Sequence, residues 1–359
     1  MTGAYWAWRT LEGGALTKPG IPGYPYLEPA QRLLLEALEG VQGAGRAVDL
    51  SARGGAVSLH LRDLGWSVGA TDDSAASLLA LRELGLEDGG GRASLVCAML
   101  EGERGNARVA AQLHTAWMRL EPDGALYLAG DKDKGFERYL KNAVSAFGAG
   151  EVVARGKGFR VARLEKRTLE PPPAPEAQRF TIQARGLEVA CVALPGVFAA
   201  GKLDAASALL LEHIPDCSGL SVLDLGAGYG ALGATLALEG ARVTMLENDA
   251  PSAQSCAETV KANELEARVL HSDVDAALKP DTKFQRVVTN PPFHVGRDLK
   301  LEVAGEFIRA AARRLLSGGD LWLVANHFLP YEALMIEVGR VETVAQARGF
   351  KVLRAQRKP

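Results

Sequence analysis

The sequence predicts an α/β protein made of two tandem, doubly wound domains that arose by duplication. Its 359 residues exceed the usual size of a single hydrophobic core. Short apolar strands alternate with amphipathic helical stretches, which is the pattern of a largely parallel sheet. Two similar halves flank the proline-rich segment 170–176. We therefore expect a first domain over residues 1–168, a linker over 169–177 and a second domain over 178–359.

Composition narrows the class of protein. Hydrophobic residues at 47% and charged residues at 23% are typical of a globular chain, and no apolar run reaches the length of a membrane span. The amino-terminal residues lack the features of a signal peptide. We therefore expect a cytoplasmic monomer without a membrane partner. Because the net charge is −2, a surface for nucleic acid has to be local.

The cysteines give no sign of a metal site. No C-x-x-C spacing and no histidine cluster accompanies any of them. We interpret all of them as reduced thiols and expect no metal. They are Cys97, Cys191, Cys217 and Cys256.

The duplication rests on a gapless match between residues 47–77 and 222–252, at a constant offset of 175 positions. Asp49 matches Asp224, and Gly55 matches Gly230. Any two α/β segments share a similar rhythm, but further matches follow in the same order and favour duplication. They are 26–38 with 202–214, 120–130 with 315–325, and 156–166 with 347–357.

The second half has the alternation of a complete doubly wound sheet. In such sheets the ligand crevice lies at the carboxyl ends of the strands, so functional residues should directly follow them. Helical segments are predicted at 251–264 and 305–316. Strands are predicted at 221–226, 242–248, 267–273, 286–291, 320–326 and 350–356.

A glycine-rich loop, "DLGAGYGALG" at 224–233, follows the first of these strands. Glycines allow a sharp turn and close approach of a ligand to the backbone. The loop fits both the dinucleotide pattern G-x-G-x-x-G and the pattern D-x-G-x-G-x-G of methyltransferases. Glu247, with Asn248 beside it, ends the second strand and suits either cofactor, because a carboxylate there accepts hydrogen bonds from ribose hydroxyls. A tight turn without a ligand is the alternative.

Two later strand ends carry polar groups. Asp273 could meet an adenine amino group or could cap a helix. "NPPF", Asn290 to Phe293, suits a planar substrate with an exocyclic amine. The Asn290 side-chain oxygen and the Pro291 carbonyl would accept the two N–H hydrogens, Pro292 would hold the backbone extended, and Phe293 would stack on the ring. Positioning and electrostatics then supply the catalysis without a strong base.

Together these motifs resemble class I adenosylmethionine-dependent methyltransferases with an N-P-P-[FY] motif. The whole chain resembles the RsmC family of small-subunit (16S) ribosomal RNA guanine-N2 methyltransferases. The stretches that carry this resemblance are 194–215, 222–230, 289–296, 321–331 and 350–356.

The resemblance implies methyl transfer from S-adenosylmethionine to the N2 amine of a guanine, with the small ribosomal subunit or its RNA as partner. It implies that Phe198 and Asp204 fold over the cofactor, and that residues 290–293 recognise the amine. It places the main cofactor contacts on Asp224, Gly226, Gly228, Gly230 and Glu247, with Asn290 also at the cofactor.

Three other functions stay open at this point. The same motif could hold adenine N6, cytosine N4 or a glutamine amide. The chain could be a non-catalytic RNA-binding assembly factor, or an oxidoreductase that leaves N-P-P-F unexplained. Basic residues that could contact RNA are Arg297, Lys300, Arg309, Arg313, Arg314 and the segment 354–359.

The first half carries a degraded form of the glycine loop, "DLSARGG" at 49–55. Ser51 and Arg53 stand at the positions of Gly226 and Gly228, where their side chains would intrude on a cofactor. Asp72 stands at the position of Glu247, but no N-P-P-F follows before the linker. We predict that this half binds no S-adenosylmethionine and serves as a scaffold or positions RNA.

Overall fold

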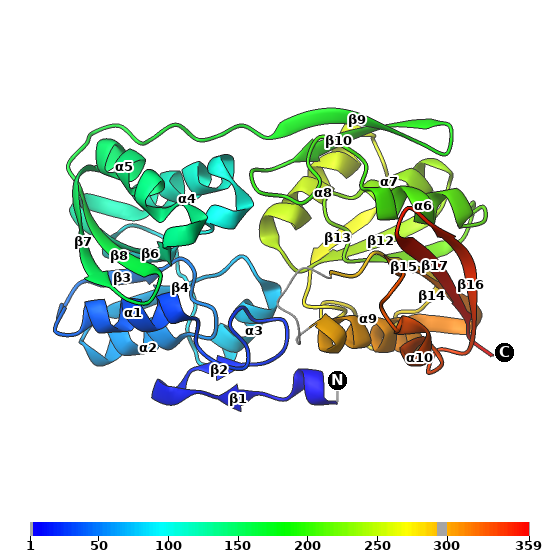
Figure 1. Ribbon diagram of the computed structural model, residues 1–359, viewed down its shortest axis with the longest axis horizontal. Coiled ribbons are helices and arrows are strands. Elements are labelled where there is room, and N and C mark those ends of the chain that lie inside the picture. The colour runs from blue at the N-terminus through cyan, green and yellow to red at the C-terminus, as the bar shows by residue number, and fades with distance from the viewer. Residues whose placement is uncertain (1–2, 293–299, 359) are drawn as a thin grey trace. The chain divides into compact units, whose positions relative to one another are not determined.

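The computed structural model describes residues 3–292 and 300–358 (Figure 1). The chain divides into two compact units. One is Trp6–Glu176, and the other combines Met1–Tyr5 with Ala177–Pro359. The division between Glu176 and Ala177 falls inside the predicted linker. The assignment of Met1–Tyr5 to the second unit is a feature that no sequence pattern indicated.

The unit Trp6–Glu176 contains a six-stranded sheet in the order β4-β3-β5-β6-β8-β7, with β7 and β8 antiparallel at one edge. Its strands are β3 (Arg46–Asp49), β4 (Ser67–Ala70), β5 (Ala93–Met99), β6 (Leu120–Asp131), β7 (Gly148–Arg155) and β8 (Phe159–Lys166). A two-stranded ladder, β1 (Arg9–Thr10) with β2 (Leu16–Thr17), precedes it.

Helices cover both faces of this sheet. The helices α1 and α2 lie on one face and α4 and α5 on the other (Figure 1). Their apolar side chains form two separate buried clusters with the strands, because the residues of a strand alternate between the faces of the sheet. The helices are α1 (Pro29–Leu38), α2 (Ala56–Asp63), α3 (Ala75–Glu83), α4 (Asn106–Arg119) and α5 (Phe136–Phe147). Short 3-10 turns are η1 (Ala4–Trp6), η2 (Glu12–Gly14), η3 (Gly102–Arg104) and η4 (Lys132–Lys134).

The second unit contains a seven-stranded sheet in the order β13-β12-β11-β14-β15-β17-β16. Its first five strands are parallel, and β17 and β16 are antiparallel at the far edge. The strands are β11 (Ser221–Leu225), β12 (Arg242–Glu247), β13 (Arg268–His271), β14 (Phe284–Thr289), β15 (Leu315–Asn326), β16 (Arg340–Ala347) and β17 (Phe350–Gln356).

Its helices again flank the sheet. Residues of α6 and α7 form a buried cluster with β11, β14 and β15, and Figure 1 shows α9 on the opposite side. The helices are α6 (Ala205–His213), α7 (Ala231–Leu238), α8 (Ala250–Ala262), α9 (Lys300–Arg314) and α10 (Tyr331–Met335). The hairpin of β9 (Gln178–Ala184) and β10 (Leu187–Ala193) packs against α7 and α8.

The two sheets confirm the predicted doubly wound repeat. In strand order, β4-β3-β5-β6-β8-β7 corresponds to β12-β11-β14-β15-β17-β16. β6 and β15 are both 12 residues long and share the same pattern of buried and exposed positions. The six strands predicted for the second half are all present, while β16 and the β9–β10 hairpin were not predicted. Among the described residues, no helix has the length and apolarity to cross a membrane.

Candidate active site

The glycine loop connects β11 to α7 at the carboxyl edge of the sheet. Gly226, Gly228 and Gly230 have φ angles of 80°, 59° and 93°, in the left-handed region that favours glycine. A Cβ on Gly226 would lie 2.9 Å from Cε1 of Phe307, so packing inside the protein requires this glycine. A Cβ on Gly228 would meet no described atom within 4 Å. Gly228 therefore borders open space that a ligand can approach closely.

Asp224, at the start of the loop, is a buried carboxyl with one satisfied oxygen. Its Oδ2 accepts a 2.8 Å hydrogen bond from the Gly233 backbone N–H. Its Oδ1 is buried and has no hydrogen-bond partner among the described residues. Burial raises the pKa of Asp224 to about 7. An unsatisfied buried acceptor beside a glycine loop indicates a place where a donor is missing.

Glu247 ends β12 and binds the loop. Its Oε2 accepts from the Gly228 N–H at 2.7 Å, and its Oε1 accepts from Asn248 N at 2.8 Å and Asp249 N at 3.0 Å. Burial raises the pKa of this carboxyl. A carboxylate offers about four acceptor positions, so one more donor, such as a ribose hydroxyl, can be accommodated. The Asn248 carbonyl is 2.7 Å from His271 Nε2.

Asp273 follows β13 at the same edge and is 2% exposed. No helix begins after it, since the chain forms turns up to β14, so the helix-cap interpretation does not apply. Its Oδ1 accepts a 2.7 Å hydrogen bond from the hydroxyl of Tyr5. Sequence reasoning missed Tyr5 because 268 positions separate the two residues and no local pattern connects them.

Asn290 lies directly after β14 and has a fixed amide. Its Nδ2 donates to Asp204 Oδ2 and to Ser207 Oγ, both at 3.1 Å. Because an ionised carboxylate only accepts, Asp204 sets which end of the amide faces it. The side-chain oxygen of Asn290, Oδ1, therefore faces away from Asp204 and can accept from another donor. Sequence reasoning did not find Ser207, although it lies on α6 just after the predicted Asp204.

Asp204 also caps α6, since its Oδ2 accepts from Ala206 N at 3.0 Å and Ser207 N at 3.1 Å. This carboxylate thus aligns the start of α6 with the strand end that carries Asn290. Phe198, which precedes it, is 58% exposed. Pro291 is buried and Pro292 exposed, whereas Phe293 lies outside the described residues.

Strand register brings the two motifs together. In the parallel pairing of β11 with β14, Asp224 is opposite Val288, so the glycine loop and the N-P-P segment leave the sheet at the same edge. Thr289 Oγ1 donates to the Leu225 carbonyl at 2.7 Å and ties the two strand ends. The site is therefore assembled by the central strands rather than by flexible loops.

Some of the basic residues that could contact RNA form ion pairs within the protein. Arg314 is 5% exposed and pairs with Asp275, which also pairs with Arg313. Arg309 pairs with Glu306. We therefore correct the expectation for Arg314, whose guanidinium holds the turn before β14 to α9. Arg297 and the side chain of Lys300 lie outside the described part of the chain.

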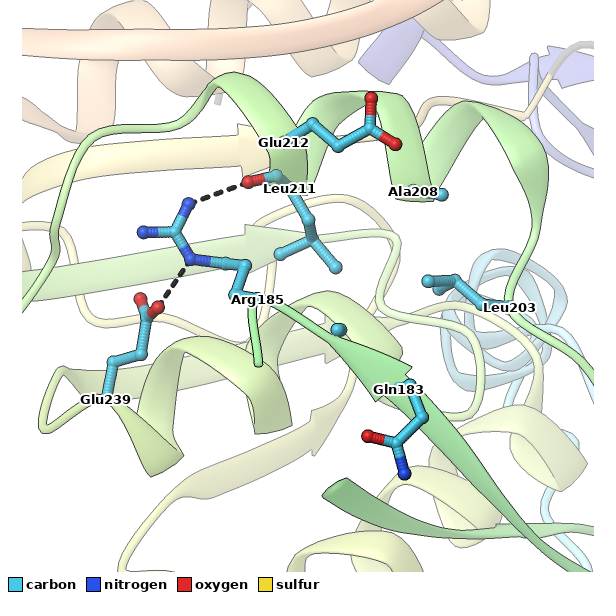
Figure 2. A pocket seen from close by; sticks show the side chains of 8 residues that line it. Gln183, Arg185, Leu203, Ala208, Leu211, Glu212 and Glu239 are labelled. Atoms are coloured by element: carbon cyan, nitrogen blue, oxygen red, sulfur yellow. Dashed lines mark hydrogen bonds and ion pairs between the residues drawn. The ribbon is translucent and has the colours of Figure 1, made fainter. Parts of the chain in front are cut away.

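A cavity of about 430 Å³ lies between the β9–β10 turn and α6 (Figure 2). Arg185 on its wall donates to the Leu211 carbonyl and pairs with Glu239. Glu212 pairs with Arg348. The acidic side chains on its wall are thus paired with arginines, and Arg185 caps the carboxyl end of α6. We therefore assign these charged groups a structural role.

No group of three or more histidine, cysteine, aspartate or glutamate side chains within residues 3–292 and 300–358 is arranged to hold a metal ion. All four cysteines are buried and free.

Fold and site together define a class I S-adenosylmethionine-dependent methyltransferase. A family model described as "Methyltransferase small domain" matches residues 188–354. Ribosomal RNA small subunit methyltransferase C of Stutzerimonas stutzeri is 36% identical over 253 residues, which cover 68% of this chain and 74% of that protein. The chain belongs to the ribosomal RNA small subunit methyltransferase C family.

Two further relatives agree. The Pseudomonas aeruginosa (strain LESB58) protein of the same description is 36% identical over 66% of this chain and 72% of its own length. A solved structure, "T. Thermophilus 16S rRNA N2 G1207 methyltransferase (RsmC) in complex with AdoMet and Guanosine", is 42% identical with a TM-score of 0.91. The match covers 99% of each chain.

The residues present fit S-adenosylmethionine. Gly228 borders the space that a nucleoside needs, and a Cβ there would point into it. Asp224, at the start of the same loop, has a buried Oδ1 without a partner among the described residues. The open acceptor capacity of Glu247 suits ribose hydroxyls. Glycines and carboxylates of the kinds that this cofactor requires thus lie at the ends of neighbouring strands.

Proposed function

We propose that this chain transfers a methyl group from S-adenosylmethionine to the exocyclic N2 of a guanine in 16S ribosomal RNA, in the cytoplasm. The observation that carries the proposal is the orientation of Asn290, whose NH2 group is held by Asp204 and Ser207 so that its oxygen is presented for an amine. A relative 42% identical over the whole chain is described as a complex with AdoMet and guanosine, which supports guanine as the acceptor.

The cofactor is proposed to lie along the carboxyl ends of β11, β12 and β13. Gly226, Gly228 and Gly230 would form its cradle, Glu247 would accept its ribose hydroxyls, and Asp273 would accept its adenine amino group. Asp224, Asn248, Phe198 and Asp204 would complete this shell. Bound there, S-adenosylmethionine supplies an electrophilic methyl group on a positively charged sulfur.

Amine recognition is proposed for the N-P-P-F segment. The Asn290 Oδ1 and the Pro291 carbonyl accept the two N2 hydrogens, while Pro292 keeps the backbone extended and Phe293 stacks on the base. These acceptors orient the nitrogen lone pair toward the methyl carbon. As the new C–N bond forms and the C–S bond breaks, they stabilise the positive charge on N2, and one N2 proton then leaves to water.

The unit Trp6–Glu176 is proposed to bind no cofactor and to act as a scaffold or to position RNA, in a chain that works as a monomer. Its counterpart of the glycine loop is filled by protein side chains, because Arg53 pairs there with Asp72 and Glu28. The support for this role is that the Arg53 side chain lies where a cofactor would have to bind.

A methyl-transfer assay tests the proposal. The protein is incubated with methyl-labelled S-adenosylmethionine and either undermethylated small subunits or free 16S ribosomal RNA. Digestion and mass spectrometry of the nucleosides should show N2-methylguanosine in at least one arm. Label in N6-methyladenosine, in N4-methylcytidine or in protein would replace guanine as the acceptor. Absence of label from every product, with intact RNA binding, would favour the non-catalytic assembly factor.

A further inference from the structure

Tyr5 connects the first described residues of the chain to the cofactor edge of the catalytic sheet. It lies in the 3-10 turn η1, is 3% exposed, and belongs to the same compact unit as Asp273. Its hydroxyl donates to Asp273 Oδ1 at 2.7 Å. This contact is a short, buried hydrogen bond to a carboxylate, the stronger class of side-chain hydrogen bond.

The surroundings keep this hydroxyl a donor. Burial raises the pKa of Tyr5 well above its ordinary value, and the negative charges of Asp273 and Glu306 raise it further. The phenol therefore stays protonated at any physiological pH. Because the hydroxyl has a single hydrogen, the 2.7 Å bond directs that hydrogen to one oxygen of Asp273.

A fixed carboxylate has a consequence for what it can recognise. One oxygen is engaged by Tyr5, and the side-chain torsion is thereby set, so the direction of the second oxygen is also set. An acceptor held in one direction favours a ligand with a donor there and disfavours a ligand with an acceptor there. Adenine presents an amino donor at its six position, whereas hypoxanthine presents a carbonyl.

We propose that Tyr5 is a positioning residue of the cofactor site, which fixes the Asp273 carboxylate so that it selects a purine with a six-amino group. The inference rests on the proposed placement of adenine against Asp273. It assigns to the amino-terminal turn a part in cofactor selection, although all other residues proposed for the site lie beyond residue 197.

Calorimetry with S-adenosylhomocysteine and S-inosylhomocysteine, which differ at the six position, tests this role in the full-length chain. Tyr5→Phe removes the hydroxyl and keeps the ring. We expect the Kd for S-adenosylhomocysteine to rise about 10-fold, because its six-amino group donates to the oriented oxygen of Asp273. The Kd for S-inosylhomocysteine should change little, because it has no amino group at that position. Tyr139→Phe is the matched control, since it removes a 2.9 Å hydroxyl bond to Asn106 in the other unit.

The same measurement with Asp273→Ala separates the inference from its premise. If Asp273→Ala weakens S-adenosylhomocysteine and Tyr5→Phe has no further effect in that background, Tyr5 acts through Asp273 as proposed. Equal weakening of both ligands by Tyr5→Phe would mean a packing role and would overturn the inference. An unchanged Kd in Asp273→Ala would instead remove the adenine assignment itself.

Discussion

The two strand-to-helix loops, 224–230 and 49–55, share a left-handed turn at Gly228 and Arg53 and differ in the side chain at that position. Their backbones differ at Gly226, which has a φ of 80°, whereas its counterpart Ser51 has no positive φ. Gly228 and Arg53 have φ angles of 59° and 52°, and their N–H groups donate to Glu247 and Asp72 at 2.7 and 2.9 Å. The degraded loop thus retains the turn of the intact one. What changed is that a glycine facing open space became an arginine whose side chain occupies it.

The Arg53 guanidinium recruits three carboxylates. Its Nε donates to Glu28 at 3.1 Å, and its Nη1 lies 3.6 Å from Asp72 and 4.0 Å from Glu101. In the sequence match, Glu28 corresponds to Asp204 and Asp72 to Glu247. Strand register relates Glu101 to Pro292. The Arg53 side chain thus lies at the position that corresponds to the proposed cofactor space of the other unit, and it neutralises the acids around it.

A second difference lies at the sheet edge. Within residues 6–176, all of which the structure describes, no strand corresponds to β13. The chain passes from α3 to β5 through a segment rich in glycine, 84–92. The strand that would place a counterpart of Asp273 is therefore missing. The unit Trp6–Glu176 therefore lacks both a counterpart of the proposed adenine position and the open space found at Gly228.

The largest effect is expected from Asn290→Ala, which removes the oriented acceptor. We expect kcat to fall about 1,000-fold with an almost unchanged Kd for S-adenosylmethionine, because the acceptor matters most as charge builds on the amine. Methyl transfer under saturating cofactor measures it. Met99→Leu, at the corresponding position of the other unit, should leave kcat unchanged. A variant of Asn290 with normal kcat would refute our account of amine recognition.

Gly228→Arg transfers the feature of the degraded loop into the intact one. We expect the Kd for S-adenosylmethionine to rise about 100-fold or more, because the side chain would fill the cradle while the turn still forms, as it does at Arg53. Calorimetry measures the Kd, and circular dichroism checks the fold. Gly228→Ala, the smaller control, should bind more tightly than Gly228→Arg.

The reverse change, Arg53→Gly, should still give one cofactor site per chain, since the β13 counterpart is absent from residues 6–176. Two sites in that variant would show that Arg53 alone had closed the pocket.

Arg53→Ala leaves its carboxylates without their cation. We expect the free energy of unfolding of the unit Trp6–Glu176 to fall by about 2 kcal/mol, because breaking a largely buried ion pair strands a desolvated charge. Chemical denaturation followed by tryptophan fluorescence measures it. The control is Arg167→Ala, whose side chain is 61% exposed and should matter far less. Equal effects of the two changes would remove the structural role of Arg53.

The smallest effect concerns pH. Burial raises the pKa of both Asp49 and Asp224 from 3.8 to about 7. Between those values the folded protein binds more protons than the unfolded one, so each carboxyl makes the free energy of unfolding fall as pH rises. Asp49→Asn and Asp224→Asn should each flatten that fall, by on the order of 1 kcal/mol per pH unit between about pH 4 and about pH 7.

The two aspartates should also differ at low pH. Asp49 accepts from Ser51 N and Ser58 Oγ, whereas the Oδ1 of Asp224 has no partner within the described residues. The change Asp224→Asn should therefore lower the free energy of unfolding less than Asp49→Asn does. Denaturation at about pH 4 compares them, and a larger loss at 224 would contradict the assignment of the unsatisfied oxygen.

Much of the fold followed from local patterns. Alternating strands and helices, the glycine loop after β11 and the substitution by Arg53 are all visible within short windows, because each depends on neighbours along the chain. The lost strand also left a signal, since residues 84–92 contain no apolar run. β16 was missed because most of its residues are exposed, and a strand with polar faces lacks the alternation that identifies it.

The orientation of the site could not be found in this way. Asp204 and Ser207 act on Asn290 across more than 80 positions, and Tyr5 acts on Asp273 across 268. Hydrogen bonds of that kind depend on how strands are ordered and on how each side chain rotates. Sequence spacing therefore predicted the polar residues that directly follow the strands, but it predicted neither Tyr5 and Ser207 nor how these side chains orient one another.

The long separation between Tyr5 and Asp273 has a consequence for synthesis on the ribosome. Domains fold as units, with the amino-terminal one first, so residues 6–176 can fold before β13 has been made. The turn that carries Tyr5 is then attached to a folded unit while its partner is still missing. The hydrogen bond between Tyr5 and Asp273 can form only after residue 273 has been made, so this part of the proposed cofactor site is completed late in synthesis.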